Sequence, residues 1–206
     1  FFVRADRRDG FDGPVTFEVS DLPAGLRANA PITIEPGQRY AVGCIWADES
    51  TPPWEGKAVV ELVATAEING KRVERRVGKA GEFTLGEPPS VVPSIQPAGR
   101  SVAENEDWTL QVRRGETVSA RVVMRRKEGF NAEVNFGKED SGRNASQGVY
   151  VDNIGLNGLL VLADKNEREF FLTADPTAQP GRRSFFLKAN VDGGVTSHPI
   201  TVEVLP

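Results

Sequence analysis

A stretch of eleven residues occurs twice in this chain. Residues 7–17 read RRDGFDGPVTF and residues 126–136 read RKEGFNAEVNF, an offset of 119 positions (126 − 7). Five positions are identical, and three more keep their chemistry. Repetition over this distance indicates two copies of one structural module, which constrains the fold more than any other feature of the sequence.

The residues around the repeat alternate between apolar and polar. In 117–126 the apolar positions are Val118, Ala120, Val122 and Met124. This period of two is typical of a half-buried β-strand. A Glu-Gly turn and a second strand-like run follow, so we expect the repeated stretch to be the central hairpin of each module.

Later strands support the same alignment. The apolar positions of 184–191 superpose on those of the first copy at an offset of 125, and Asn69-Gly70 predicts a two-residue hairpin turn. The offset is 127 (174 − 47) at the Ala47/Ala174 pair. We therefore expect about eight extra residues in the second copy, within 139–148, since insertions usually lie in surface loops.

The length of 206 residues suits two domains of about 100 residues each. Short strands with frequent Gly and Pro turns favour an all-β fold of two tandem immunoglobulin-like β-sandwich domains. We place the domains at residues 1–86 and 100–206. Four prolines in the stretch between them predict an extended Pro-rich linker over 87–99.

The first module is expected to be incomplete. A strand over Trp108–Val112 opens the second module, and its counterpart in the first would precede Phe1. The first module would then have an unpaired strand edge, to which another strand could add. We expect residues preceding Phe1 in a longer protein to supply this strand.

Composition argues against several classes of function. A net charge of −4 gives no general attraction to nucleic acid or anionic membrane, and no apolar run is long enough to insert in a membrane. Nucleophilic catalysis needs a base within reach of the nucleophile. The single cysteine, Cys44, and the single histidine, His198, lie in different modules. We therefore expect a protein that is not an enzyme.

Calcium is the one cofactor that the sequence brings into question. Asp9 and Asp12 lie together in the first repeat. Calcium needs six or more oxygen ligands, whereas Asp in hairpins more often serves turn geometry. Both interpretations stay open.

Aromatic residues are the other candidates for binding. Trp54 lies in the Pro-rich loop TPPWEG, which could expose it. Trp46 faces either the core or an outward apolar stripe with Tyr40, Val42 and Cys44. Exposed aromatic rings with apolar neighbours mark binding sites, including platforms that stack on sugars.

The run RRDGFDGPVTFEVSDLPAGL, the turn ITIEPGQ and a strand ending at Trp46-Ala47-Asp48 resemble a family of bacterial immunoglobulin-like modules. These modules are similar to fibronectin type III domains and recur in tandem in large exported proteins, often beside pre-peptidase C-terminal-type domains. The resemblance implies export to the periplasm, cell surface or medium. It supplies no catalytic residue to carry over.

Together these features predict a non-catalytic structural or interaction module of a larger exported bacterial protein, acting as a spacer or protein-docking repeat. Its partners would be other domains of the same protein or another protein chain, docked by strand addition. Two alternatives stay open. One is a carbohydrate-binding module that uses Trp54 and Trp46, and the other is an accessory part of an exported hydrolase.

Overall fold

The structure is a computed structural model that describes residues 1–48, 50–103, 106–138, 141–152 and 154–206. The chain divides into two compact units, Phe1–Glu87 (unit 1) and Pro88–Pro206 (unit 2). Every regular element among the described residues is a strand, which confirms the predicted all-β class. Within these ranges no helix has the length and apolar character needed to span a membrane.

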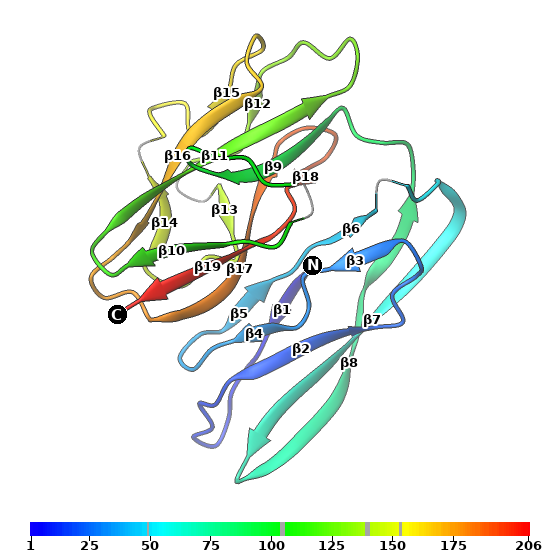
Figure 1. Ribbon diagram of the computed structural model, residues 1–206. Coiled ribbons are helices and arrows are strands. Elements are labelled where there is room, and N and C mark those ends of the chain that lie inside the picture. The colour runs from blue at the N-terminus through cyan, green and yellow to red at the C-terminus, as the bar shows by residue number, and fades with distance from the viewer. Residues whose placement is uncertain (49, 104–105, 139–140, 153) are drawn as a thin grey trace. The chain divides into compact units, whose positions relative to one another are not determined.

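Unit 1 is built from three small sheets (Figure 1). Four strands form one sheet in the order β4-β2-β7-β8, and two pairs, β1-β5 and β3-β6, complete the unit. The strands are β1 (Phe2–Arg4), β2 (Val15–Ser20), β3 (Leu26–Ala28), β4 (Ile32–Ile34), β5 (Tyr40–Val42), β6 (Ile45–Ala47), β7 (Trp54–Ile68) and β8 (Lys71–Leu85).

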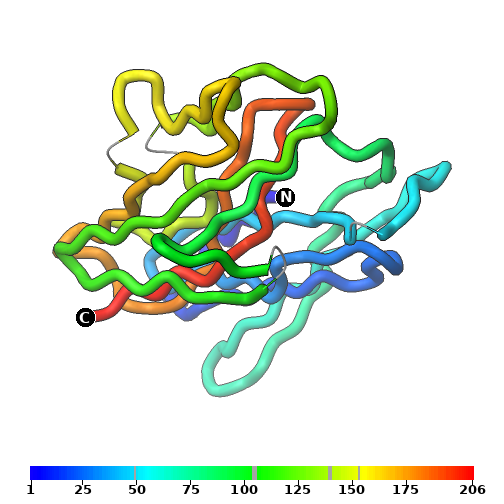
Figure 2. Tube along the Cα trace, turned by 45° about the horizontal axis from the view of Figure 1, so that its top comes forward, coloured from blue at the N-terminus to red at the C-terminus, as the bar shows by residue number. Residues whose placement is uncertain are grey.

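The longest element of unit 1 is the β7–β8 hairpin, which Figures 1 and 2 show reaching beyond the other strands of the unit. Its turn is Asn69-Gly70, as the sequence predicts. Both residues have positive φ, 52° and 73°, which a two-residue turn of this kind requires. The side chains of Val60 and Leu62, two residues apart on β7, are both buried, and Leu62 belongs to the core cluster of the unit.

The core of unit 1 is small. Six buried side chains from five different strands form it: Val3, Phe17, Ile32, Ile34, Ala41 and Leu62. Each buried aliphatic or aromatic side chain contributes about 1.5–3 kcal/mol. A core of this size leaves unit 1 dependent on further contacts made by its loops.

Unit 2 has two larger sheets. Their strand orders are β14-β16-β11-β9 and β10-β19-β17-β13; β18 pairs with β17, and β12 pairs with β15. The strands are β9 (Val91–Pro97), β10 (Thr109–Arg113), β11 (Thr117–Arg126), β12 (Val134–Asn135), β13 (Gly142–Arg143), β14 (Val149–Asp152), β15 (Leu160–Val161), β16 (Glu167–Ala174), β17 (Gly181–Ala189), β18 (Val195–Thr196) and β19 (Ile200–Leu205).

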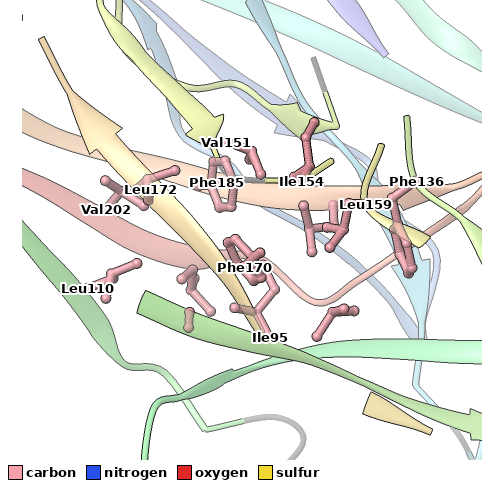
Figure 3. Close-up of a cluster of buried hydrophobic side chains, with 14 of the residues drawn as sticks. Ile95, Leu110, Phe136, Val151, Ile154, Leu159, Phe170, Leu172, Phe185 and Val202 are labelled. Carbon is pink, nitrogen blue, oxygen red and sulfur yellow. The ribbon is translucent and has the colours of Figure 1, made fainter. Parts of the chain in front are cut away.

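The two sheets of unit 2 enclose one continuous core, shown in Figure 3. Phe170 and Ile95 point inward from one sheet, and Phe185 and Val202 meet them from the other. Alternate residues of each strand supply these contacts, because successive side chains point to opposite faces. The arrangement is sandwich-like, in agreement with the β-sandwich expectation.

The two units repeat the same strand pairings. Val15 pairs with Ile34 in unit 1, and Val134 pairs with Val161 in unit 2. These partners are related by the offsets of 119 and 127 that the sequence alignment gives. The pairing Val3↔Ala41 in unit 1 likewise corresponds to Val122↔Arg168 in unit 2.

The repeated stretch is not a hairpin, so this prediction is wrong. β1 pairs with β5, whereas β2 pairs with β4 and β7. Asp9-Gly10 does form a tight turn, with φ of 53° and 75°. The residues after the turn, 11–14, then carry the chain into a different sheet. The stretch is therefore an arch between sheets, and unit 2 repeats it from β11 to β12.

The predicted linker over 87–99 is also corrected, because most of it is strand β9, an edge strand paired antiparallel with β11. Proline lacks an N–H and is tolerated where an edge strand needs no hydrogen bond. In this register the backbone nitrogens of Pro93 and Pro97 face away from β11, because the direction of the backbone groups alternates along a strand. Proline content therefore misled the linker prediction.

The extra residues of unit 2 are divided between two places rather than one. Gly25 O accepts a hydrogen bond from Asp48 N, and Gly148 O accepts one from Asp175 N. This equivalence gives an offset of 123 (148 − 25), so about half of the insertion precedes Gly148. The rest lies between β14 and β15. Part of the predicted insertion, residues 139–140, lies outside the described residues.

Candidate functional site: the groove beside strand β1

The arch of unit 1 is held by one arginine side chain. Arg7 is the first residue of the repeat, and its side chain is 12% exposed. Its guanidinium donates hydrogen bonds to the carbonyls of Gly13 at 3.1 Å, Ile34 at 3.2 Å and Glu35 at 2.8 Å, and also to that of Gln38. The side chain thus ties the arch to the turn after β4.

Arg126 has the same role in unit 2. Its guanidinium donates to the carbonyls of Ala132 at 2.6 Å, Leu162 at 2.9 Å and Lys165 at 3.0 Å. These acceptors occupy the positions that correspond to those around Arg7. Neither arginine was predicted to hold an arch, although their identity in both copies of the repeat was the available signal.

Beyond the arch, β1 offers an open edge. Among the described strands β1 pairs only with β5. Ala5 N donates to Arg39 O on the β5 side. Because antiparallel pairing alternates, the backbone groups of Phe2, Arg4 and Asp6 face the opposite side. That edge borders a groove.

The groove beside β1 has a volume of about 970 Å³. β1 and the arch form one wall, and the β7–β8 hairpin forms the other. Three large apolar side chains that line it are exposed: Phe2 at 61%, Val77 at 52% and Ile68 at 39%. An apolar surface of this kind on a small domain is typical of an interaction site.

The groove is also positively charged. It is lined by five basic residues (Arg4, Arg7, Arg8, Arg75, Lys79) and three acidic ones (Asp6, Asp9, Asp12). Arg4 pairs with Asp6 at 2.8 Å. Neither Arg8 nor Arg75 forms an ion pair with any described residue, so both guanidinium groups are available to an acidic ligand.

The two acidic residues considered for calcium lie in the wall of this groove. Asp9 occupies the turn with positive φ, and Asp12 Oδ1 accepts a hydrogen bond from Gly37 N at 2.9 Å. Arg7 Nε lies 3.8 Å from the same carboxylate. Among the described residues no group of three or more His, Cys, Asp or Glu side chains could hold a metal ion. Calcium binding at Asp9 and Asp12 stays an open alternative, as it was from the sequence.

The proposed aromatic stripe is interrupted. Tyr40 is 59% exposed, and its ring stacks on Phe2 with centroids 5.5 Å apart. Cys44 is buried, and Trp46 is half-buried. Tyr40 belongs to β5, which pairs with β1, whereas Trp46 belongs to β6, which pairs with β3. The break between β5 and β6 stops the alternation on which the stripe depended.

Trp54 is not in a loop. It begins strand β7, pairs with Leu85 of β8 and is half-buried. Neither Trp54 nor Trp46 lines the groove beside β1. The structure therefore brings Tyr40 next to Phe2 and the groove, and leaves the two tryptophans apart from it.

Cys44 is enclosed in unit 1, with 4% of its surface exposed. Burial raises the pKa of the Cys44 thiol from 9.0 to about 12, because the charged thiolate is poorly solvated there. The thiol is therefore protonated and protected at neutral pH.

Comparison with known proteins adds little. No protein-family model matches the chain, and no curated protein matches it. One similar solved structure is described as "protein of unknown function from Porphyromonas gingivalis W83". It is 13% identical over 94% of this chain and 86% of that chain, with a TM-score of 0.32. A likeness at this TM-score supports no conclusion about fold or function.

Proposed function

We propose that the chain is a non-catalytic module of a larger exported bacterial protein, made of two tandem immunoglobulin-like β-sandwiches. It acts as a spacer and as a docking site for another protein segment. The observation that carries this proposal is the open edge of β1 beside an apolar groove, since exposed edges bind extended chains by strand addition.

The repeated scaffold supports the spacer role. Each unit has its own hydrophobic core and its own arginine-held arch. Modules of this kind can bear load separately. Pulling the chain from its two ends should give two rupture events, with contour-length gains of about 30 nm and 40 nm for units of this length. A single event that releases the whole chain would contradict the spacer proposal.

Carbohydrate binding is a second candidate, and one observation favours it. The Tyr40 ring is exposed and stacked on Phe2, which gives a flat aromatic surface next to the groove. Such surfaces can stack on sugar rings. Trp54 stays the other aromatic candidate, although its indole is half-buried.

A polysaccharide and glycan array, run with and without calcium, separates the two candidates. We expect no glycan binding by the wild-type chain. Binding that Tyr40→Ala or Trp54→Ala abolishes would replace the docking proposal with a carbohydrate-binding function. Binding that disappears only when calcium is removed would assign a metal to the region of Asp9 and Asp12.

A further inference from the structure

Unit 2 contains the strand that the groove of unit 1 lacks among its described residues. In unit 2, β9 lies antiparallel to β11, as Figures 1 and 2 show. The offset of 119 places residues 121–127, which comprise the second half of β11 and Lys127, on residues 2–8 of unit 1. A strand equivalent to β9 would therefore lie along the open edge of β1, in the groove.

The backbone pattern of the two edges is the same. In unit 2, Met124 N donates to Asn166 O, away from β9, and Lys127 N donates to Ser90 O, at the start of β9. Odd-numbered residues of β11 therefore face β9. Their counterparts in unit 1 are the even-numbered residues of β1, whose backbone groups face the groove.

We propose that this groove binds one extended segment of a partner polypeptide, antiparallel to β1 and in the register that β9 has on β11. The inference rests on the proposed docking function and specifies its partner. The segment has apolar side chains at alternate positions, as β9 has at Val91, Pro93 and Ile95, and an acidic residue near the arch.

Apolar burial supplies the affinity. The side chains of Phe17 and Leu62 are buried in the groove wall, while Phe2, Ile68 and Val77 are exposed on it. In unit 2, β9 buries Val91 and Ile95 with 0% and 3% exposure. A bound segment would cover the exposed side chains of the groove in the same way, at about 25 cal/mol per Å² of apolar surface removed from water.

Charge selects the segment. The Ser90–Lys127 hydrogen bond corresponds to a contact between the start of the bound strand and Arg8. Arg8 and Arg75 have no ion-pair partner among the described residues, so a carboxylate at the Ser90 position would meet unpaired positive charge. A second copy of this chain that paired through its own β1 edge would bring the same excess of positive charge to the groove and is disfavoured as the occupant.

The first experiment measures binding of a labelled synthetic peptide, PPSVVPSIQPAG, to the full 206-residue chain. Its sequence is that of residues 88–99. We expect saturable binding below about 1 mM peptide. Methylation of the backbone nitrogen at Ser94, which faces β1, should weaken binding by about tenfold or more. Methylation at Ile95, whose N–H faces away, is the matched control and should have little effect.

Substitutions in β1 of the chain, rather than in the peptide, test the same backbone edge. Arg4→Pro removes an N–H that faces the groove and leaves the β1–β5 hydrogen bonds in place, so it should abolish peptide binding. Arg4→Ala is the control and should retain binding. Protection of Cys44 from a thiol reagent reports whether unit 1 of each variant is folded.

The charge requirement is tested with paired peptides. Ser90→Glu in the peptide should bind about threefold more tightly than the parent, and Ser90→Lys should bind more weakly. The difference should shrink at high salt and disappear in the Arg8→Ala chain. Equal affinities of the two peptides would remove the acidic residue from the proposal.

Other outcomes overturn the inference. No binding at about 1 mM peptide would exclude a β9-like segment, while leaving docking at another surface intact. Binding that is indifferent to both Ser94 methylation and Arg4→Pro would show that the peptide does not add to β1. Self-association of the chain that Arg4→Pro abolishes would make a second copy the occupant instead.

Discussion

Replacement of Arg7 by methionine tests the contribution of the arch to stability. Methionine keeps much of the apolar stem of arginine and removes the guanidinium. The carbonyls of Gly13, Ile34, Glu35 and Gln38 would lose their donor. At about 1 kcal/mol for each acceptor, the upper value is about 4 kcal/mol. Water can replace the guanidinium at the loop carbonyls, so we expect a loss of about 2–4 kcal/mol.

The assay is the rate at which a thiol reagent labels Cys44 under native conditions. Cys44 is the only cysteine and is buried in unit 1, so it reacts only when unit 1 opens. A loss of about 2–4 kcal/mol should accelerate labelling by about 30- to 700-fold, at about 1.4 kcal/mol for each factor of ten. Arg7→Lys keeps the positive charge but not the planar guanidinium, so its labelling rate should lie between the rates of the wild type and Arg7→Met.

Arg126→Met is the matched control, because it removes the same group from the arch of unit 2. The two units have separate cores, so this variant should leave the labelling rate of Cys44 unchanged while destabilising unit 2. An Arg7→Met rate within about twofold of the wild type would refute the reasoning, since it corresponds to less than about 0.5 kcal/mol.

Three further predictions concern other residues. Burial raises the pKa of Cys44 to about 12, so the neutral thiol contributes fully to stability below about pH 9, and this contribution falls as the pH rises toward 12. In urea unfolding, the wild-type chain should therefore lose stability relative to Cys44→Ala between about pH 9 and 12. A stability difference that does not change with pH would contradict the raised pKa. Trp108 Nε1 donates a hydrogen bond to Ile95 O at 3.2 Å. Trp108→Phe should lower the free energy of unfolding of unit 2 by about 1–3 kcal/mol and should speed amide exchange in β9. Unchanged amide exchange in the variant would contradict this role of the indole. Gly158 has a φ of 76°, and a Cβ there would clash with the Gly137 carbonyl. Gly158→Ala should therefore destabilise unit 2 by about 2 kcal/mol or more, measured by Trp108 fluorescence. A variant as stable as the wild type would be inconsistent with the clash.

The sequence predicted the parts of the fold that depend on alternation and repetition. The apolar periods gave the strands around Val60 and Val122, and Asn69-Gly70 gave the hairpin. The structure repeats the strand pairings at the predicted offsets because the same buried positions recur in both units. These features depend on local patterns, which a sequence displays directly.

Features that depend on partner strands were harder to predict. A tight turn at Asp9-Gly10 is compatible with both a hairpin and an arch, and only the identity of the flanking partners decides between them. The prolines of β9 suggested a linker, because the sequence alone does not show that they lie on the edge strand of a sheet. The facing of Trp46 depended on a break between β5 and β6 at Gly43, which the alternation of the flanking residues did not reveal.

The candidate site was predicted only in outline. An open edge in the first module was expected, and β1 has one partner among the described strands. The groove itself was missed, because Phe2, Ile68 and Val77 are far apart in the sequence and come together only through the β7–β8 hairpin. The roles of Arg7 and Arg126 were also missed, because their identity in both copies of the repeat does not reveal the distant carbonyls that they bind.

The two prolines of β9 limit how far its sheet can grow. Pro93 and Pro97 occupy positions that face outward from the sheet, and the carbonyl of Ile95 between them is occupied by the Trp108 indole. A further strand would find fewer donors there, because Pro93 and Pro97 have no N–H, so β9 resists extension of the sheet. A partner segment with the same proline spacing would disfavour strand addition beyond the edge of β1 in the same way, which favours a one-to-one complex over growth into fibres.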